Sequence, residues 1–412
     1  MFNKISIVEV FLMSTFQIKE GIYWVGVRDW NIRYFHGPAY STHQGTTYNS
    51  YIIKDDKNVL VDGVYKPFID RFFAHIEEVI DFKEIDYYVV NHVEPDHSSS
   101  FPRTMERLRD DVTVICSDKG KEGIIEHYGD GYNFKIVSTG DTVNIGRRNL
   151  TFVNAQMLHW PDSMFTYIPE EKALLSNDAF GMHLCTSQLY DDQVDDCLIM
   201  NEAKKYFANI LTPFSSILLK KLKEVQKMNI EIDMIAPAHG IIWRKEPTKI
   251  IEKYLEWAEG QAKEKVIIVY ETMWDSTELM AKKIADGLID QGIEVHFYRK
   301  SKSDKNDIIK EFLDAKAIII GSSTINNVII PELVPLLEEL EGLRFKNKLG
   351  AAFGSYGWRG GATKRITNRL EKAKIELIGE PLEVVYVPDG EQLRRCYEFG
   401  VEIAKRIREA VN

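Results

Sequence analysis

The chain has 412 residues, of which 44% are apolar and 28% are charged, and its formal charge at pH 7 is −10. This length favours two domains, and this composition is typical of a globular protein with full hydrophobic cores. The acidic balance argues against nucleic acid as a partner, and no apolar stretch approaches the roughly 18 residues that a membrane-spanning helix needs.

The N-terminal residues 5–13 are mildly apolar, but they include Glu9 and no small-residue cleavage site. They are therefore interpreted as a dispensable extension rather than a signal peptide. The four cysteines are scattered without any C-x-x-C pair. This pattern predicts reduced thiols in a cytoplasmic protein, and it excludes a built-in rubredoxin module, which needs two such pairs to hold its iron.

The first part of the chain mixes strands and helices without strict alternation. Short strands are predicted at 22–27, 49–54 and 59–62, with turn residues between them. This pattern favours an α+β fold, an αββα arrangement with two mixed sheets. A predicted helix at 247–258 is followed by a polar stretch at 259–265, so the expected domains are residues 1–260 and 265–412.

Potential metal ligands cluster after the apolar run at 87–90. His92, Glu94, Asp96 and His97 lie within six residues, in a loop that leaves a predicted strand. Four ligand-type side chains in so short a loop indicate a metal site, with a solvated polar loop as the alternative.

Three more candidate ligands follow predicted apolar strands. His159 follows 151–158, Asp178 follows 173–177, and His239 follows 234–238. Each of them alone is more often a structural residue, but strand ends in one sandwich can converge on one spot. Together with the loop after residue 90, they predict a single metal centre.

Other aromatic and histidine side chains have weaker signals. Trp160 and Tyr48 are candidates to line or support the site, with core packing as the alternative. His183 is expected at the edge of the pocket rather than as a ligand, and His36 has no visible metal context.

The C-terminal part alternates strictly between strands and helices. Strands are predicted at 266–270, 294–298, 317–321, 349–354 and 382–386, and helices at 277–291, 305–313, 331–341, 362–374 and 391–410. Five such units predict a doubly wound parallel sheet with helices on both faces.

Three loops, at 271–277, 321–327 and 354–361, lie at the carboxyl edge of this predicted sheet, where such folds bind ligands. The hydroxyl-rich loop at 271–277 leads into a helix N-terminus that suits a phosphate, although a simple helix cap is the alternative. The loop at 354–361 combines glycines with Trp358, which can stack on a flat ring. The candidate cofactor-binding residues are Thr272, Met273, Trp274, Asp275, Ser276, Thr277, Ser322, Ser323, Thr324, Asn326, Asn327, Gly354, Ser355, Tyr356, Gly357, Trp358, Gly360 and Gly361.

From about residue 20 onward the chain resembles the metallo-β-lactamase superfamily and, within it, the flavodiiron proteins, or A-type flavoproteins. The superfamily pattern is H-x-H-x-D-H, and this chain has Glu94 in place of the second histidine. A carboxylate there adds a hard anionic ligand, which favours iron over the zinc of the hydrolases. The three C-terminal loops resemble the flavodoxin pattern of the same family, which implies FMN rather than FAD.

The resemblance also implies the division of the ligands between two irons. One iron takes His92, Glu94 and His159, and the other takes Asp96, His97 and His239, with Asp178 as the bridge. A homodimer with the head-to-tail arrangement, or a tetramer built from such dimers, is the assembly that the resemblance implies.

The activity that the resemblance implies is four-electron reduction of O₂ to water. The loops at 270–277 and 354–361 resemble those of methanogen-type members, which favours reduced coenzyme F-420 as the donor of electrons to FMN, with rubredoxin as the other donor. Reduction of nitric oxide to nitrous oxide at the same centre is the alternative function. A zinc hydrolase that carries a flavodoxin module only for interactions is a second alternative, and Glu94 argues against it.

Overall fold

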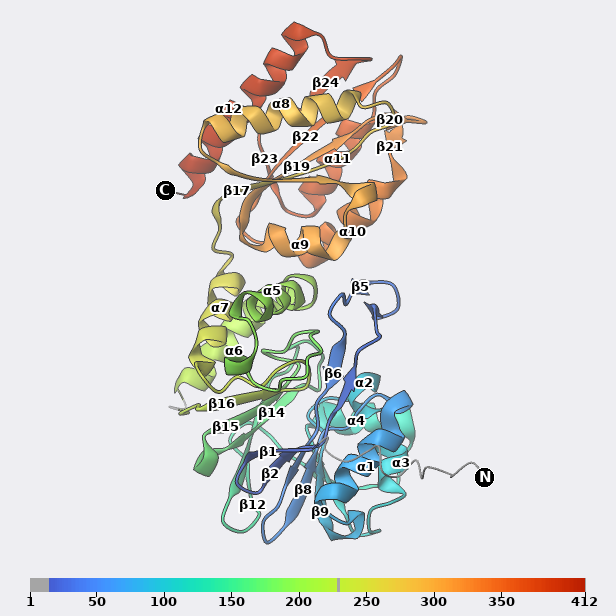
Figure 1. The fold of residues 1–412 in the computed structure, drawn as a ribbon, viewed down its shortest axis with the longest axis vertical. Helices are drawn as coiled ribbons and strands as arrows, with labels where there is room; N and C mark the ends of the chain where they lie inside the picture. The colour runs from blue at the N-terminus through green and yellow to red at the C-terminus, as the bar shows by residue number, and fades with distance from the viewer. Residues whose placement is uncertain (1–14, 228–229, 412) are drawn as a thin grey trace, which may run out of the picture. The chain divides into compact units, whose positions relative to one another are not determined.

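The computed structural model describes residues 15–227 and 230–411, so the expected extension before Met13 lies outside the described residues. The chain forms two compact units (Figure 1). The first runs to Ala203 and takes in Lys220–Ile251, and the second comprises Lys204–Leu219 and Glu252–Asn412. The sequence-based boundary at 260–265 therefore falls 8 to 13 residues after Glu252, where the second unit resumes. None of the helices in the described ranges is long and apolar enough to cross a membrane.

The first unit contains a mixed seven-stranded sheet of order β1-β2-β7-β8-β9-β10-β11. The pairs from β1 to β8 are antiparallel, and those from β8 to β11 are parallel. Its strands are β1 (Phe16–Lys19), β2 (Ile22–Trp24), β7 (Tyr51–Ile53), β8 (Asn58–Val61), β9 (Ile85–Val89), β10 (Thr113–Cys116) and β11 (Asn133–Ile136).

The strand predicted at 22–27 is wrong in its extent. It ends at Trp24, and the chain continues as β3 (Val27–Asp29), which pairs in a separate ribbon with β6 (Thr46–Tyr48). Tertiary packing explains the break, because a Cβ at Gly26 would lie 2.4 Å from the carbonyl oxygen of Tyr48. A second short ribbon joins β4 (Tyr34–Phe35) to β5 (Tyr40–Ser41).

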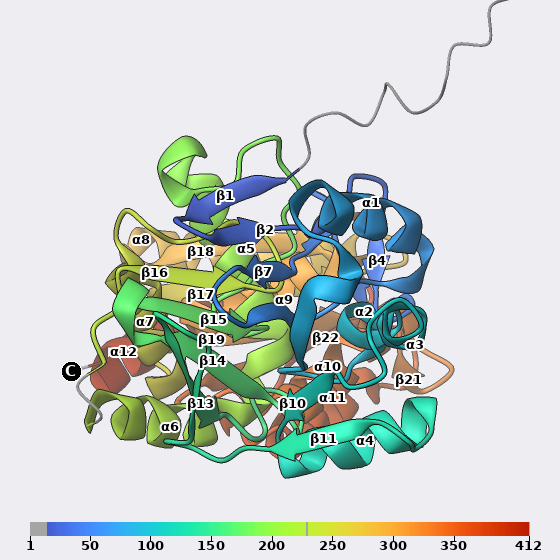
Figure 2. The same ribbon diagram turned by 90° about the horizontal axis from the view of Figure 1, so that it is seen from below.

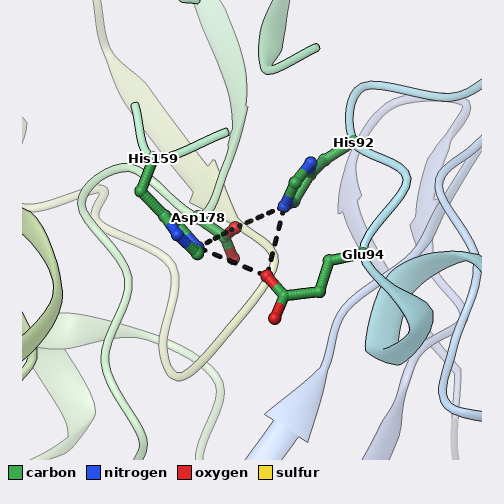
Figure 3. Close-up of side chains that lie close together, drawn as sticks. All are labelled: His92, Glu94, His159 and Asp178. Atoms are coloured by element: carbon green, nitrogen blue, oxygen red, sulfur yellow. Dashed lines mark hydrogen bonds and ion pairs between the residues drawn. The ribbon is translucent and has the colours of Figure 1, made fainter. Parts of the chain in front are cut away.

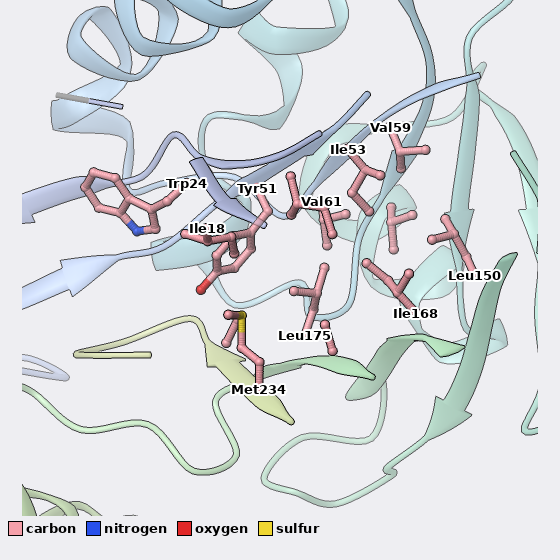
Figure 4. Close-up of a cluster of buried hydrophobic side chains, with 14 of the residues drawn as sticks. Ile18, Trp24, Tyr51, Ile53, Val59, Val61, Leu150, Ile168, Leu175 and Met234 are labelled. Atoms are coloured by element: carbon pink, nitrogen blue, oxygen red, sulfur yellow. The ribbon is translucent and has the colours of Figure 1, made fainter. Parts of the chain in front are cut away.

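The second sheet of this unit has the order β12-β13-β14-β15-β16 and is also mixed, since only β15 and β16 are parallel. Its strands are β12 (Thr142–Asn144), β13 (Asn149–Asn154), β14 (Met164–Ile168), β15 (Ala173–Asn177) and β16 (Met234–Pro237). The apolar faces of the two sheets meet in one core, where Ile53 and Val61 face Leu150 and Leu175 (Figure 4). Each such aliphatic side chain contributes roughly 1.5–3 kcal/mol by its burial.

Helices flank the two sheets, which confirms the predicted αββα architecture. Helices α1 (Ile69–Val79), α3 (Phe101–Met105) and α4 (Asp118–Tyr128) lie on the side of the seven-stranded sheet, and α6 (Ser215–Lys227), which belongs to this unit from Lys220 on, lies beside the five-stranded sheet (Figures 1 and 2). Helix α7 (Pro247–Glu259) begins in this unit and continues in the second. Helix α1 shows why: Phe72, Phe73 and Ile76 are buried on one face, at the spacing that an amphipathic helix requires. Two further helices are α2 (Pro95–Ser98) and α5 (Asp196–Tyr206).

The second unit is a parallel sheet of order β18-β17-β19-β22, extended by β23 and β24, which both pair with β22. This is the doubly wound, flavodoxin-like order, as predicted. The strands are β17 (Lys263–Glu271), β18 (Glu294–Arg299), β19 (Ala315–Ser322), β22 (Leu349–Tyr356), β23 (Glu376–Leu377) and β24 (Leu382–Val385). A small hairpin of β20 (Thr324–Ile325) and β21 (Val328–Ile329), which the sequence did not predict, begins in the second candidate loop, 321–327, and ends just after it.

The helices that connect and follow these strands are α8 (Ser276–Asp290), α9 (Lys305–Asp314), α10 (Val334–Leu343), α11 (Ala362–Lys372) and α12 (Gly390–Val411). Helices α8 and α12 touch through glycines, because a Cβ at Gly287 would lie 2.2 Å from the carbonyl oxygen of Tyr397, and one at Gly400 equally close to that of Ile284. The absence of side chains at these two positions lets the backbones of α8 and α12 pack in close contact.

Candidate functional site

The candidate metal ligands follow strands of both sheets in the first unit. His92 lies three residues after β9, and the loop continues through Glu94 into the short helix α2. Asp178 directly follows β15, and His239 lies two residues after β16. Strand β13 ends at Asn154 rather than at the predicted residue 158, because a turn closed by the N–H of Leu158 on the carbonyl of Ala155 precedes His159.

One group of ligand atoms is formed by His92, Glu94, His159 and Asp178 (Figure 3). The Nε2 atoms of His92 and His159 lie 3.3 and 3.4 Å from Glu94 Oε2. The same two nitrogens lie 3.4 and 3.2 Å from Asp178 Oδ2. Four ligand atoms thus surround one point.

A second group is formed by Asp96, His97 and His239. Asp96 Oδ2 lies 3.2 Å from His97 Nε2 and 3.0 Å from His239 Nε2. The other oxygen of Asp178, Oδ1, faces this group at 2.9 Å from His97 Nε2 and 3.5 Å from His239 Nε2. The carboxylate of Asp178 therefore presents one oxygen to each group.

The donor set fits two cations. Asp178 Oδ2 and both carboxylate oxygens of Asp96 are buried and carry no hydrogen bond within the described part of the chain. Burial alone raises the pKa of Asp178, but the imidazoles of His97 and His159 hold it well below its usual value. Burial likewise lowers the pKa of His97, yet Asp96 and Asp178 raise it to about 9. Three buried carboxylate oxygens, from two aspartates, without hydrogen-bond donors to satisfy them are the environment in which metal ions replace protons.

Residues behind the ligands orient the histidine rings. Asp162 Oδ2 accepts hydrogen bonds from Nδ1 of His92, at 2.9 Å, and from the backbone N–H of Val93, at 2.7 Å. His239 Nδ1 donates to the carbonyl oxygen of Thr47 at 2.6 Å. Because Nδ1 is the donor in both rings, Nε2 is the nitrogen that offers its lone pair to a metal in the site.

A buried amide and carboxylate network joins the two sheets behind the site. Asp62, at the end of β8, accepts from the backbone N–H and the side-chain amide of Asn91 and from the side-chain amide of Asn177. Asn177 in turn accepts from the backbone N–H of Asp178 at 2.8 Å. Burial raises the pKa of Asp62. This network fixes the residue before His92 and the residue before Asp178 relative to each other.

The structure corrects the interpretation of His36, which had no metal context in the sequence. Its Nε2 lies 2.8 Å from Glu94 Oε1, on the side of that carboxylate that faces away from His92. His183 is buried, and its Nδ1 shares a hydrogen bond with Thr46 Oγ1 at 2.9 Å. Its ring centroid lies 4.8 Å from that of His239. It belongs to neither ligand group. Trp160 packs edge-on against His92, with ring centroids 5.1 Å apart, and Tyr48 lies 5.9 Å from His239.

The second candidate site is a cavity of about 610 Å³ at the carboxyl edge of the parallel sheet. All three predicted loops contribute to it, and Trp274 and Trp358 stand at its rim with exposed fractions of 87% and 92%. That exposure excludes core packing as the role of Trp358. The residues that line it are Met273, Trp274, Ser276, Ser323, Thr324, Ile325, Asn326, Asn327, Ser355, Tyr356, Gly357, Trp358, Arg359, Tyr386 and Val387.

Hydroxyl groups from the three loops meet at the start of α8. Thr277 Oγ1 lies 2.8 Å from both Ser323 Oγ and Ser355 Oγ. Asp275, the residue before the helix, has a φ of 64° and makes no side-chain cap, so the first N–H groups of α8 are not capped by it. The hydroxyl of Thr272 is buried without a hydrogen bond among the described residues. This arrangement fits an anionic phosphate.

Several functional candidates were missed by the sequence reasoning. Tyr386 and Val387 line the cavity from a fourth loop after β24, and Arg359 lines it from within the third loop. The end of the strand predicted at 382–386 could have indicated Tyr386 and Val387, because it lies at the same carboxyl edge of the sheet. The predicted residues that do not line the cavity are Thr272, Asp275, Thr277, Ser322, Gly354, Gly360 and Gly361.

Two of these residues, Gly354 and Gly361, must be glycines for a steric reason. A Cβ at Gly354 would lie 2.3 Å from the carbonyl oxygen of Ser322, and one at Gly361, whose φ is +149°, would lie 2.8 Å from that of Asn327. The second and third loops can approach each other only because these positions have no side chain.

Comparison with known proteins gives the same two-part division. A family model described as ODP family beta lactamase matches residues 46–240, and one described as flavodoxin matches residues 268–400. A protein of Moorella thermoacetica named nitric oxide reductase is 57% identical over 394 residues, which cover 95% of this chain and 98% of that protein. An anaerobic nitric oxide reductase flavorubredoxin of Vibrio vulnificus is 44% identical, over 95% of this chain and 80% of that protein.

Two solved structures superpose on nearly the full length of this chain. The rubredoxin oxygen:oxidoreductase of Desulfovibrio gigas superposes with a TM-score of 0.94 at 34% identity, over 97% of this chain and all of the other. The flavodiiron protein of Giardia intestinalis gives a TM-score of 0.92 at 33% identity, over 97% of this chain and 98% of that one. With its two ligand groups, its flavodoxin domain and these relatives, the chain belongs to the flavodiiron family of oxidoreductases.

Proposed function

We propose that this flavodiiron protein reduces nitric oxide to nitrous oxide, with reduction of O₂ to water as the second candidate. The observation that carries a two-metal reaction is the carboxylate of Asp178, which presents Oδ1 to one ligand group and Oδ2 to the other. The order of the two substrates follows from the relatives. The 57% identical protein is named for nitric oxide reduction, and a structural neighbour at 34% identity is named for oxygen.

We assign one iron to His92, Glu94 and His159 and the other to Asp96, His97 and His239, with Asp178 as the bridge. Glu94 carries the distinction from the zinc hydrolases, because an anionic oxygen at this position favours iron. Asp162 and the carbonyl of Thr47 keep His92 and His239 in the tautomer that ligates through Nε2.

The chemistry that bound iron supplies is electron transfer: two NO, two electrons and two protons give N₂O and water, whereas O₂ needs four electrons and four protons. The chain's own residues position the reactants. The buried ligand groups exclude bulk water, and the network of Asp62, Asn91 and Asn177 holds their loops rigidly. Both ends of a diatomic molecule, or two such molecules, can be held between the groups.

We assign FMN to the cavity in the flavodoxin domain. The hydroxyls of Thr277, Ser323 and Ser355 at the start of α8 suit its phosphate, and Trp274 and Trp358 suit the faces or edge of its ring system. A rubredoxin-type protein is the donor that the names of the relatives favour, and reduced coenzyme F-420 is the alternative. A head-to-tail homodimer, or a tetramer of such dimers, is the proposed assembly in the cytoplasm.

Anaerobic assays test the function directly. Protein reduced beforehand is mixed with NO or with O₂, and N₂O formation and O₂ consumption are measured beside the iron, zinc and FMN content. We expect about two irons and one FMN per chain and formation of N₂O. Zinc in place of iron, in protein made with both metals available, would contradict the redox assignment. Faster consumption of O₂ with little N₂O would reverse the order of the two candidates.

A further inference from the structure

A second cavity of the flavodoxin domain lies at the edge of the sheet opposite to the flavin cavity. Its volume is about 740 Å³. Lys316 and Leu349 line it at the starts of β19 and β22. Glu376 lines it at the start of β23, and Ala262 lines it just before β17. Since these strands are parallel, this cavity lies at their amino ends, whereas the flavin cavity lies at their carboxyl ends.

Three of the residues that line this cavity are lysines, and two of them are buried. Lys348 is 3% exposed and Lys316 is 8% exposed, while Lys374 is an exposed residue of the same lining. A lysine is almost never buried to this extent without an acidic partner. None of these three lysines forms an ion pair within residues 15–227 and 230–411.

The two buried ammonium groups are bonded to carbonyl oxygens instead. Lys348 Nζ donates to the carbonyl oxygens of Leu313 and Ala315 at 2.7 and 2.6 Å. Lys316 Nζ donates to the carbonyl oxygen of Asn347 at 3.1 Å, which is its one hydrogen bond in the described part of the chain, although an ammonium group has three donors. Carbonyl groups accept hydrogen bonds but carry no net charge, so both positive charges are left without a counter-ion.

The carboxylates around the cavity do not supply the missing charge. Glu376, the acidic residue of the lining, pairs with Arg406 at 3.5 Å. Glu409 pairs with the same arginine at 3.2 Å, and Glu264 pairs with Arg408 at 3.8 Å. These three glutamates therefore face arginines rather than the lysines.

Two further carboxylates near the lysines belong to a separate ion-pair cluster. Asp314 lies 2.8 Å from Lys204 and 3.1 Å from Lys265, and Glu311 pairs with the same two lysines. Glu259, which precedes the lining residues 260–262, accepts a hydrogen bond from a neighbouring side-chain amide and has no cationic partner among the described residues. The cavity thus has three unpaired lysines against one unpaired carboxylate.

The electrostatic environment of Lys348 reflects this surplus of positive charge. Burial lowers the pKa of Lys348 to about 7. Asp314 opposes the shift, but Lys316, Lys204 and Lys265 add to it by repulsion. An anion in the cavity would remove the cause of this repulsion and favour the charged form of the amine.

We propose that the cavity at the amino edge of the flavodoxin sheet binds a tetrahedral dianion, a phosphate group, between Lys316 and Lys374. This inference is independent of the proposed function. A dianion balances the surplus of two positive charges, and lysine ammonium groups bind phosphate as point charges. The described lining holds no aromatic side chain on which a base could stack, so the phosphate itself is the recognised group.

The test is calorimetric titration of the FMN-loaded protein with inorganic phosphate, and separately with sulfate, at low ionic strength. Occupation of the flavin site by FMN keeps its phosphate subsite from binding the probe. We expect one anion per chain, with binding that weakens as sodium chloride is added. Because sulfate has a fixed charge, its binding at pH 7 should be accompanied by proton uptake by the protein, since an anion raises the pKa of Lys348.

Variants locate the site. K316Q/K374Q should bind phosphate about tenfold or more weakly, because it removes two charged donors. The matched control is K364Q, at an exposed lysine without an ion pair among the described residues, near the start of α11 and so at the carboxyl edge of the sheet. It should bind phosphate as the wild type does. FMN content should be unchanged in both variants.

Other outcomes are equally informative. If K316Q/K374Q does not fold, K374Q alone replaces it, because Lys374 is exposed, and its expected loss is about threefold. Tighter binding of ADP than of phosphate would identify the phosphate end of a nucleotide as the ligand, and weaker binding would identify the free ion. Failure of the wild type to bind either anion at about 10 mM would overturn the proposal. Wild-type affinity in the cavity variant, or an equal loss in K364Q, would overturn it as well.

Discussion

The ligand groups of the first unit and the flavin cavity of the second are built in different ways. His92, Asp96, His97, Asp178 and His239 are all at most 7% exposed, and hydrogen bonds from the chain already fix their rings and loops. The flavin cavity is open, and its most prominent side chains, Trp274 and Trp358, are almost fully exposed.

The difference teaches which parts of each site are preorganised. At the metal centre, hydrogen bonds within the chain already hold the charged ligand side chains close together, so metal ions bind to a site that is formed in advance. At the flavin cavity the hydroxyl cluster and the glycine-based loop contacts are preorganised, whereas the aromatic side chains at the rim are exposed. Substitutions should therefore have large effects at the first site and graded effects at the second.

The largest effect is expected for Asp178→Ala, because its carboxylate serves both ligand groups. Iron should fall from about two per chain to below one, while FMN stays bound in its separate domain. Elemental analysis and flavin absorbance measure both quantities. Glu94→Ala is the matched comparison and should affect one iron only. Loss of FMN with retention of both irons would show that the two domains have been assigned the wrong way round.

A smaller loss is expected for Asp162→Ala, which removes the acceptor for Nδ1 of His92 without touching a ligand. The affinity for iron at the His92 group should fall about 10–100-fold, while the His97 group keeps its metal. Iron retention during dialysis against a chelator measures this. Equal loss from both groups would mean that Asp162 acts through general stability rather than through the His92 ring.

Gly354→Ala tests whether the flavin cavity also has a rigid part. The new Cβ would lie 2.3 Å from the carbonyl oxygen of Ser322, so the loops must separate. We expect a cost of about 1–3 kcal/mol in the free energy of unfolding and weaker FMN binding. Gly342→Ala is the control, because a Cβ there meets nothing within 4 Å. Wild-type stability and FMN affinity in Gly354→Ala would remove the distinction between the rigid floor and the open rim.

The smallest effect is expected for Trp358→Ala. Aromatic stacking is worth roughly 0.5–1.5 kcal/mol, so FMN affinity should fall about three- to tenfold. The melting temperature of the FMN-free protein should not change, because the side chain is 92% exposed. Trp30→Ala, at a half-exposed tryptophan of the first unit, should leave FMN affinity unchanged. An unaltered dissociation constant in Trp358→Ala would take this residue out of the proposed flavin site.

Local patterns in the sequence were sufficient to predict the fold of the C-terminal domain and the presence of a metal site. The alternation of strands and helices after residue 266 predicted the doubly wound sheet, because each βαβ unit has its own hydrophobic period. The loop from His92 to His97 predicted metal binding, because its ligands are neighbours in sequence as well as in space. Together with the resemblance to flavodiiron proteins, these patterns also indicated both cofactors.

Tertiary structure alone decided the contacts between distant segments. Asp162 lies 70 residues from His92, and His36 lies 58 residues from Glu94, so no local pattern could pair them. The β20–β21 hairpin and the early end of the strand at Trp24 likewise depend on what packs against them. Periodicity and motif spacing describe structure that is local in the sequence. A buried carboxylate such as Asp162 contacts its histidine only when the two sheets pack together, and that packing depends on the whole core.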